Sequence, residues 1–161
     1  MQTHTSQGTA RSQVPAIHKW GLLGTRNLDY GGGPFNKATE YLSGFGVANF
    51  VMDPYNRTLE HNFGVYTALK DTPAPSAIIA NVLNVIPGQM NRNKVLSVVK
   101  ALVERDGLIL IACHPGNGSG VGQETLKGCW QENRPTRSYL QEVQAVFPSA
   151  YYKHGYIIAT R

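Results

Sequence analysis

Residues 27–35 constrain this chain most, and they read Asn-Leu-Asp-Tyr-Gly-Gly-Gly-Pro-Phe. A short apolar run ends in an acid, and three glycines and a proline follow. Glycine reaches backbone angles closed to other residues and lets a ligand approach the main chain. Proline suits the first turn of a helix. We therefore expect a strand, a tight turn and a helix start, the layout that binds nucleotides in open α/β sheets.

Chain length and composition predict one globular domain. The chain has 161 residues, of which 42% are hydrophobic and 16% are charged, which suffices for a substantial core. We expect a single domain over residues 14–161, preceded by a flexible N-terminal segment over the polar residues 1–13. The net charge of +5 permits an anionic partner such as nucleic acid, but it does not require one.

The cysteines and the hydropathy bear on the expected location. Cys113 and Cys129 form no CxxC pair, so their spacing predicts neither a zinc site nor a disulfide framework and favours a reduced, cytoplasmic setting. No apolar stretch approaches membrane-spanning length, and no signal peptide is visible. We therefore expect no membrane partner, and no metal is implied.

Apolar runs alternate with helical patterns along the chain. Continuous apolar runs, typical of strands buried on both faces, predict strands at 26–30, 47–52, the first half of 77–86, and 108–113. Helical spacing predicts helices at 14–23, 36–42, 92–105 and 135–147. Residues 151–160 predict a closing hairpin or a single kinked strand. Residues 55–76 show no clear period: 65–69 predict a poor strand or a helix fragment, and 72–76 is predicted to be a connection. This order predicts a three-layer α/β sheet, mostly parallel, with an antiparallel hairpin at its end.

Polar residues follow three of the predicted strands. Asp29 precedes the glycines, Asp53 ends the second strand, and Asn81 and Asn84 lie where the next apolar run ends. Ligands in open α/β sheets bind at the carboxyl ends of the strands, so we expect these three strand ends to meet. Asp53 lies twenty positions after Gly33, where an acid can accept hydrogen bonds from both hydroxyls of a ribose.

Two cofactors, NAD and S-adenosylmethionine (SAM), fit a glycine turn followed by such an acid. NAD would place its pyrophosphate against the turn, where Asp29 would repel it. SAM would place an ammonium and a sulfonium there, which Asp29 attracts, while backbone N–H groups and a helix start can take the carboxylate. The dinucleotide pattern also needs a glycine where Asn36 stands. Both arguments favour SAM.

The residues of the turn also resemble a known family. Residues 28–33 resemble the first motif of class I SAM-dependent methyltransferases, and Asp53 matches their ribose-binding acid. The combination of Leu-Asp-Tyr-Gly, Asp-Pro and Val-Leu-Asn-Val-Ile resembles methyltransferases associated with DNA-modification systems. The resemblance implies a Rossmann-like class I methyltransferase sheet, with residues 81–86 after its fourth strand, beside the methyl donor and the acceptor.

The sequence departs from that family at several points. Phe35 stands where the family usually has a third glycine, so the first helix is expected to start differently. The family's acid after a third strand, near the adenine, has only Asp71 and Asn62 as candidates. No separate target-recognition domain fits in 161 residues.

Individual residues follow as candidates, those of the cofactor site from the resemblance and the others from their residue type and their positions after predicted strands and the glycine loop. The residues expected to bind SAM are Asp29, Tyr30, Gly31, Gly32, Gly33, Asp53, Pro54, Asn81 and Val82. The candidate catalytic residues on the acceptor side are Asn84, Tyr55 and His114, and the candidate substrate-binding residues are Trp130 and Gln131. More ordinary roles stay open: the asparagines can bind loop backbone, His114 can be structural, and Trp130 can fill the core.

The functions that follow belong to different classes. The first is SAM-dependent methyl transfer to an N or O acceptor, where the positive charge and the resemblance favour nucleic acid slightly over a small molecule. The second is a SAM-binding, non-catalytic or regulatory subunit of a larger complex, and a weaker third is an NAD-dependent oxidoreductase. A protein partner or a homo-oligomer remains open.

Overall fold

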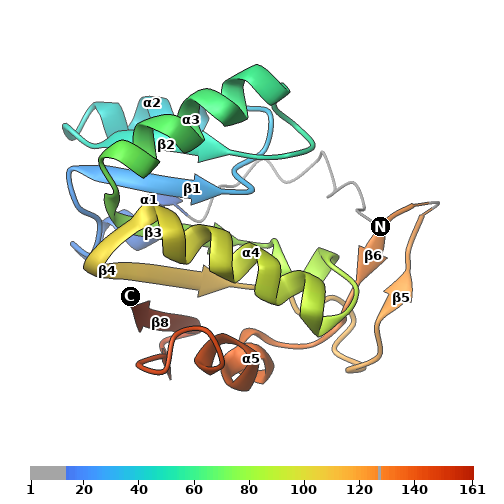
Figure 1. The fold of residues 1–161 in the computed structure, drawn as a ribbon. Helices are drawn as coiled ribbons and strands as arrows, with labels where there is room; N and C mark the ends of the chain where they lie inside the picture. The colour runs from blue at the N-terminus through green and yellow to red at the C-terminus, as the bar shows by residue number, and fades with distance from the viewer. Residues whose placement is uncertain (1–13, 127) are drawn as a thin grey trace.

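The computed structural model describes residues 14–126 and 128–161, so the segment predicted to be flexible, residues 1–13, lies outside the described residues. Six strands form one sheet in the order β2-β1-β3-β4-β8-β7 (Figure 1). The strands of this sheet are β1 (Arg26–Tyr30), β2 (Ala48–Met52), β3 (Ala74–Ala80), β4 (Val103–Ala112), β7 (Tyr151–Lys153) and β8 (Tyr156–Thr160). A separate antiparallel pair consists of β5 (Gln123–Glu124) and β6 (Trp130–Gln131).

The helices are α1 (Val14–His18), α2 (Lys37–Ser43), α3 (Leu59–Asp71), α4 (Gln89–Leu102) and α5 (Leu140–Gln144). Two 3₁₀ helices, η1 (Leu83–Val85) and η2 (Thr136–Tyr139), lie after β3 and before α5. No helix of the described residues has the length and hydropathy needed to span a membrane.

The four strands β2, β1, β3 and β4 run parallel, whereas β8 and β7 add an antiparallel hairpin at one edge. β2 lies on one side of β1 and β3 lies on the other, so the strand order reverses at the carboxyl end of β1. In open α/β sheets, this reversal opens the crevice in which ligands bind.

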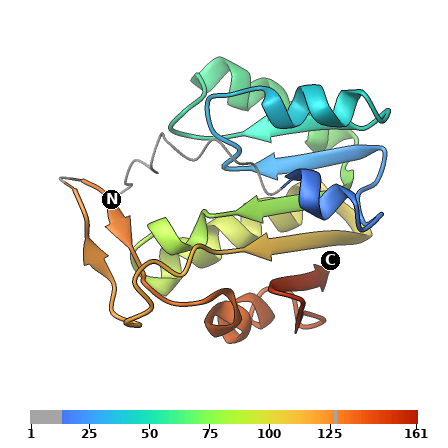
Figure 2. The ribbon, with the colours of Figure 1, turned by 180° about the vertical axis from the view of Figure 1, so that it is seen from behind.

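Helices cover both faces of the sheet, which confirms the predicted three layers. Helices α3, α4 and α5 cover one face (Figure 1), and α1 and α2 cover the other (Figure 2). Neighbouring residues of β3 belong to the hydrophobic cores on opposite faces of the sheet: Ile79 packs toward α3 and α4, whereas Ile78 packs toward α1 and α2. Both side chains are fully buried, which is why the strand reads as a continuous apolar run.

In the least readable interval, residues 55–76, the helix alternative for 65–69 is confirmed, whereas the connection predicted at 72–76 is wrong from Ala74 on. Residues 59–71 form helix α3, but only Val65 and Leu69 of it are buried, so its helical period is faint in the sequence. Strand β3 begins at Ala74, within the stretch predicted to be a connection. Pro75 is tolerated there because the pairing of β3 with β4 is irregular between Ala74 and Ser76.

Side chains of α3 cover the outer edge of β2. The His61 Nε2–H donates to the Val51 carbonyl at 2.8 Å, and the Asn62 side chain bonds both the N–H and the carbonyl of Asp53 at 2.9 Å. Residues 53–73 contain no strand, so residues 81–86 follow the third strand of the described residues, not the fourth as expected. Of the two candidates for the acid near the adenine, Asn62 is engaged by the main chain of Asp53, and Asp71 is the last residue of α3, just before β3 begins and away from the carboxyl ends of the strands.

The C-terminal part follows the predicted order with different bounds. Helix α4 begins at Gln89, after Gly88 in the left-handed region (φ +77°), and gives way at Val103 to β4. The helix predicted at 135–147 is shorter, comprising η2 and α5, and the closing hairpin is confirmed. The β5–β6 pair has no counterpart among the predictions. It projects beyond the ends to which the parallel strands point (Figure 1).

Candidate functional site

A pocket of about 220 Å³ lies at the carboxyl ends of β1, β2 and β3, where the strand order reverses. Its lining combines a few polar groups with apolar side chains, as small-molecule sites do. The lining residues are Tyr30, Gly31, Asp53, Pro54, Tyr55, Asn56, Val82, Val85, Ile86, Asn91 and Val95.

The glycine turn forms the edge of the pocket on β1. Gly31 and Gly33 adopt left-handed angles (φ +78° and +77°), and the Gly31 N–H donates to the Met52 carbonyl at 2.8 Å. A Cβ on Gly31 would lie 2.3 Å from Cγ2 of Val82. The turn thus needs glycine twice over, for its backbone angle and for the close approach of β1 to the segment after β3.

Asp29 lies directly beneath this turn. It is 4% exposed, and a Cβ on Gly32 would lie 2.6 Å from its Oδ2. The carboxylate accepts a long hydrogen bond, 3.5 Å, from Asn49 Nδ2. Burial raises its pKa from the ordinary value of 3.8 to about 6, and the nearby Asp53 carboxylate adds to the rise, while Asn49 and the Arg57 guanidinium oppose it. A buried carboxylate held this weakly is suited to a cationic ligand.

Asp53 is held in a different way. Its Oδ2 accepts hydrogen bonds from the Gly33 N–H at 2.9 Å and from Asn56 Nδ2 at 3.0 Å. Its Oδ1 accepts from the N–H groups of Tyr55 and Asn56, both at 3.0 Å. A carboxylate offers about four acceptor positions, so the protein itself fills them. Asp53 thereby joins the turn after β1 to the loop after β2.

The end of β3 carries the two predicted asparagines. Asn81 adopts a left-handed angle (φ +59°), with its N–H donating to the Ala112 carbonyl at 2.8 Å, but it does not line the pocket. Asn84 is 2% exposed and donates to Gln131 Oε1 at 3.2 Å. Its Oδ1 is buried without a hydrogen-bond partner among the described residues.

Three further candidates, His114, Trp130 and Gln131, lie outside the pocket lining. Gln131 links two of the predicted sites, because it accepts from Asn84 and donates from Nε2 to the His114 carbonyl at 3.0 Å. Trp130 donates from Nε1 to Glu132 Oε1 at 3.0 Å and packs on Gly122. These contacts attach β6 to the ends of β3 and β4.

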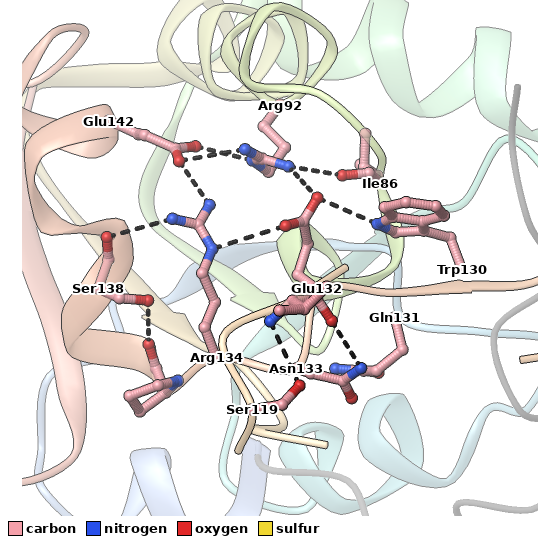
Figure 3. A network of polar contacts seen from close by, with 12 residues as sticks. Ile86, Arg92, Ser119, Trp130, Gln131, Glu132, Asn133, Arg134, Ser138 and Glu142 are labelled. Carbon is pink, nitrogen blue, oxygen red and sulfur yellow. Dashed lines mark hydrogen bonds and ion pairs between the residues drawn. The ribbon is translucent and has the colours of Figure 1, made fainter. Parts of the chain in front are cut away.

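A buried network of ion pairs stabilises the attachment of β6 to the sheet (Figure 3). Arg92 of α4 pairs with Glu132 and with Glu142, both at 2.7 Å, and donates to the Ile86 carbonyl at 2.8 Å. Arg134 pairs with Glu142 and lies over the ring of Tyr139, 3.9 Å from its centre. The network binds the segment after β6 to α4 and α5, next to the pocket residue Ile86.

The pocket brings together six of the predicted residues: Tyr30, Gly31, Asp53, Pro54, Tyr55 and Val82. Asp29, Gly32 and Gly33 do not line the pocket, although they belong to the strand end and the turn that border it. Val85 and Ile86 belong to the segment 81–86 that was expected beside the cofactor, whereas the sequence interpretation missed Asn56, Asn91, Val95 and the nearby Arg57. Asn91 and Val95 are four apart on α4, and that helical spacing after Gly88 was the available signal.

Strand order, glycine turn and pocket together define the class: this chain has the Rossmann-like fold of the class I methyltransferases. No protein-family model matches the chain, and no curated protein matches it. Among solved structures, it is similar to 1,6-didemethyltoxoflavin-N1-methyltransferase from Burkholderia thailandensis, which was solved with 1,6-didemethyltoxoflavin and S-adenosylhomocysteine. That similarity covers 96% of this chain and 78% of the other, at 14% identity and a TM-score of 0.68.

Two other solved structures of methyltransferases have a similar fold. One is SAM-bound CalS10, an amino pentose methyltransferase from Micromonospora echinaspora, at 10% identity over 96% of this chain and 94% of that one, with a TM-score of 0.64. The other is a SAM-dependent methyltransferase from Methanosarcina mazei, at 12% identity over 91% and 97%, with a TM-score of 0.61. At these identities, the comparison establishes the fold.

Proposed function

We propose that this protein is a methyltransferase that binds SAM at the glycine turn and transfers its methyl group to an N or O acceptor. The observation that carries the proposal is the buried Asp29 carboxylate beneath Gly32, at the switch point of a methyltransferase fold. An ammonium close to Asp29 would satisfy a charge that the protein leaves weakly bonded. A pyrophosphate at the same place would meet repulsion, which disfavours NAD.

The residues of the pocket fit the remaining parts of SAM. Asp53 would hold the ribose: a hydroxyl can take the place of Asn56 Nδ2, while three main-chain N–H groups keep the carboxylate in position. Val82 and its apolar neighbours Val85 and Ile86 would line the adenine side. Asp29 and the glycines would hold the methionine part.

The reaction makes few demands on side chains. When bound, SAM supplies a methyl group that its sulfonium already activates. The chain's task is to align the acceptor with it, and alignment alone can contribute much of the rate. Asn84, Tyr55 and His114 are the candidates to orient the acceptor, and Trp130 and Gln131 are candidates to contact it, on the side that β6 covers.

We favour a small-molecule acceptor over a nucleic acid. The solved structures described above include a methyltransferase of 1,6-didemethyltoxoflavin and one of an amino pentose, both small molecules. Nucleic acid is the alternative that the sequence resemblance to DNA-modification methyltransferases supports.

Calorimetry tests the cofactor. We expect SAM and S-adenosylhomocysteine to bind the wild-type protein, and Asp29→Asn to weaken SAM much more than Asp106→Asn, a matched change at an exposed aspartate. NADH binding that survives Asp29→Asn would instead identify an oxidoreductase.

A labelled-methyl assay then tests the reaction, with duplex DNA, RNA and a metabolite extract as separate acceptor pools. Transfer to the extract supports the proposal, and transfer to DNA or RNA selects the alternative acceptor. Tight SAM binding without transfer to any pool would identify a SAM-binding subunit instead of an enzyme.

A further inference from the structure

The side chain of Arg57 makes three hydrogen bonds to the glycine turn and the residues that follow it. Its Nε donates to the Gly33 carbonyl at 2.8 Å. Its Nη2 donates to the Phe35 carbonyl at 3.1 Å and to Asn36 Oδ1 at 2.9 Å. The planar guanidinium therefore spans the turn from its last glycine to the residue before α2.

The loop that carries Arg57 is itself firmly held. The Arg57 N–H donates to the Asp53 carbonyl at 3.1 Å, so the loop closes as a turn directly after β2. Thr58 then caps α3, its Oγ1 accepting from the His61 N–H at 3.2 Å. The guanidinium thus rests on the end of a strand and the start of a 13-residue helix.

The loop after β2 provides hydrogen-bond partners for main-chain groups of the glycine turn. Gly33 gives its N–H to Asp53 and its carbonyl to Arg57, so both of its main-chain groups are bonded to the loop. Asn36 occupies the N-cap position of α2, but its side chain makes no capping hydrogen bond and accepts from Arg57 instead. The turn's conformation accordingly depends on Arg57.

Arg57 also balances charge at the site. Two charged groups influence the Asp29 carboxylate, Asp53 and Arg57, both from the loop after β2, and Asn49 of β2 adds a neutral amide. Asp53 raises the pKa of Asp29 and Arg57 lowers it. Arg57 is the positive charge that offsets the two neighbouring carboxylates.

We propose that Arg57 is a positioning residue of the cofactor site: its guanidinium fork fixes the glycine turn above Asp29, and its charge offsets the neighbouring carboxylates of Asp29 and Asp53. The inference rests on the proposed function. The two parts of the role are separable, because lysine keeps the charge and loses the planar fork, whereas glutamine loses both.

The experiment compares Arg57→Lys and Arg57→Gln with the wild type, and with Arg105→Lys and Arg105→Gln as controls at an exposed position. Two quantities are measured: SAM affinity by calorimetry between pH 5 and pH 8, and hydrogen exchange of residues 31–37 in the ligand-free protein. Circular dichroism establishes that each variant is folded.

We expect both Arg57 variants to exchange faster over 31–37 and to bind SAM at least about tenfold more weakly at pH 8, from the loss of charge-assisted hydrogen bonds. Only Arg57→Gln should move the pH midpoint of SAM binding upward, since only it removes the charge beside Asp29. A merely structural residue would not produce that difference.

The inference would be overturned if both Arg57 variants kept the wild-type hydrogen exchange over 31–37, the wild-type SAM affinity and the wild-type pH midpoint of binding. If the pH midpoint of SAM binding does not change in Arg57→Gln, the electrostatic part of the inference is wrong. Failure of the proposed function has a different signature, since the wild-type protein would then not bind SAM at all, and exchange over 31–37 would still decide whether Arg57 positions the turn.

Discussion

Replacing Asp29 with asparagine is expected to stabilise the free protein while it weakens cofactor binding. Asp29 is 4% exposed, and its pKa is raised from 3.8 to about 6, mainly by burial. At about 1.4 kcal/mol per pH unit, the difference corresponds to about 3 kcal/mol that the ionised carboxylate costs the folded state at neutral pH. Asparagine has nearly the same shape and carries no charge, so it avoids this cost.

The sign of the effect fixes its pH window. An acid whose pKa is higher in the folded than in the unfolded chain favours folding at low pH. That contribution is fully present below about pH 3.8 and is lost as the pH rises through about 6. The stability advantage of Asp29→Asn should therefore be small at pH 4, grow between pH 4 and pH 6, and reach about 3 kcal/mol at pH 7, or roughly 6–12 °C in Tm for a chain of this size.

Urea denaturation at pH 4, 5, 6 and 7 measures this directly, with Asp106→Asn as the exposed control. Saturating SAM should cancel most of this difference, because we expect the wild-type protein to bind SAM about a hundredfold more tightly than the variant, which corresponds to about 2.7 kcal/mol. The reasoning is refuted if the wild type is at least as stable as Asp29→Asn at pH 7 without ligand. A stability difference that does not change with pH would refute the electrostatic explanation.

Three other substitutions have definite expected outcomes. Gly32→Ala places a Cβ 2.6 Å from Asp29 Oδ2, so calorimetry should show loss of SAM binding in a protein whose circular dichroism is unchanged. Arg92→Met leaves Glu132 and Glu142 with Arg134 as the one remaining cation of the network, and urea denaturation at pH 7 should show a loss of about 3 kcal/mol. Thr136→Val removes the hydroxyl that bonds both the N–H and the carbonyl of Cys113, at 3.0 and 3.2 Å, and should cost about 1–3 kcal/mol in the same assay.

The strands and the glycine turn could be predicted because they depend on the hydrophobicity and backbone preferences of neighbouring residues in the sequence. Residues 26–30 were predicted as a strand with the bounds that β1 has, and Ile78 and Ile79 form the continuous apolar run of a strand covered on both faces. Gly31 could be predicted because the turn needs its positive backbone angle, and Asp29 because it lies near the end of the strand. Such features follow from a few consecutive residues.

Helix α3 and the loop before it were not predictable in the same way. Only Val65 and Leu69 of α3 are buried, because the helix also covers the edge of β2 with the polar side chains of His61 and Asn62. A helix that covers a sheet edge by hydrogen bonding leaves little hydrophobic period to read. Arg57 was missed for a related reason: its partner Gly33 is 24 positions away, and nothing local distinguishes it from a solvated arginine.

Asp53 shows why the candidate site cannot be assigned from residue types alone. Its position predicts a ribose ligand, and the same carboxylate holds Gly33, Tyr55 and Asn56 in place. Replacing Asp53 by alanine would remove all four hydrogen bonds, so a loss of SAM affinity would follow whether or not the carboxylate touches the ribose. Replacing Asn56 by alanine removes only the side-chain bond at 3.0 Å and frees one acceptor position on Oδ2. If the ribose takes that position, Asn56→Ala should bind SAM at least as tightly as the wild type, because no protein group then competes for it.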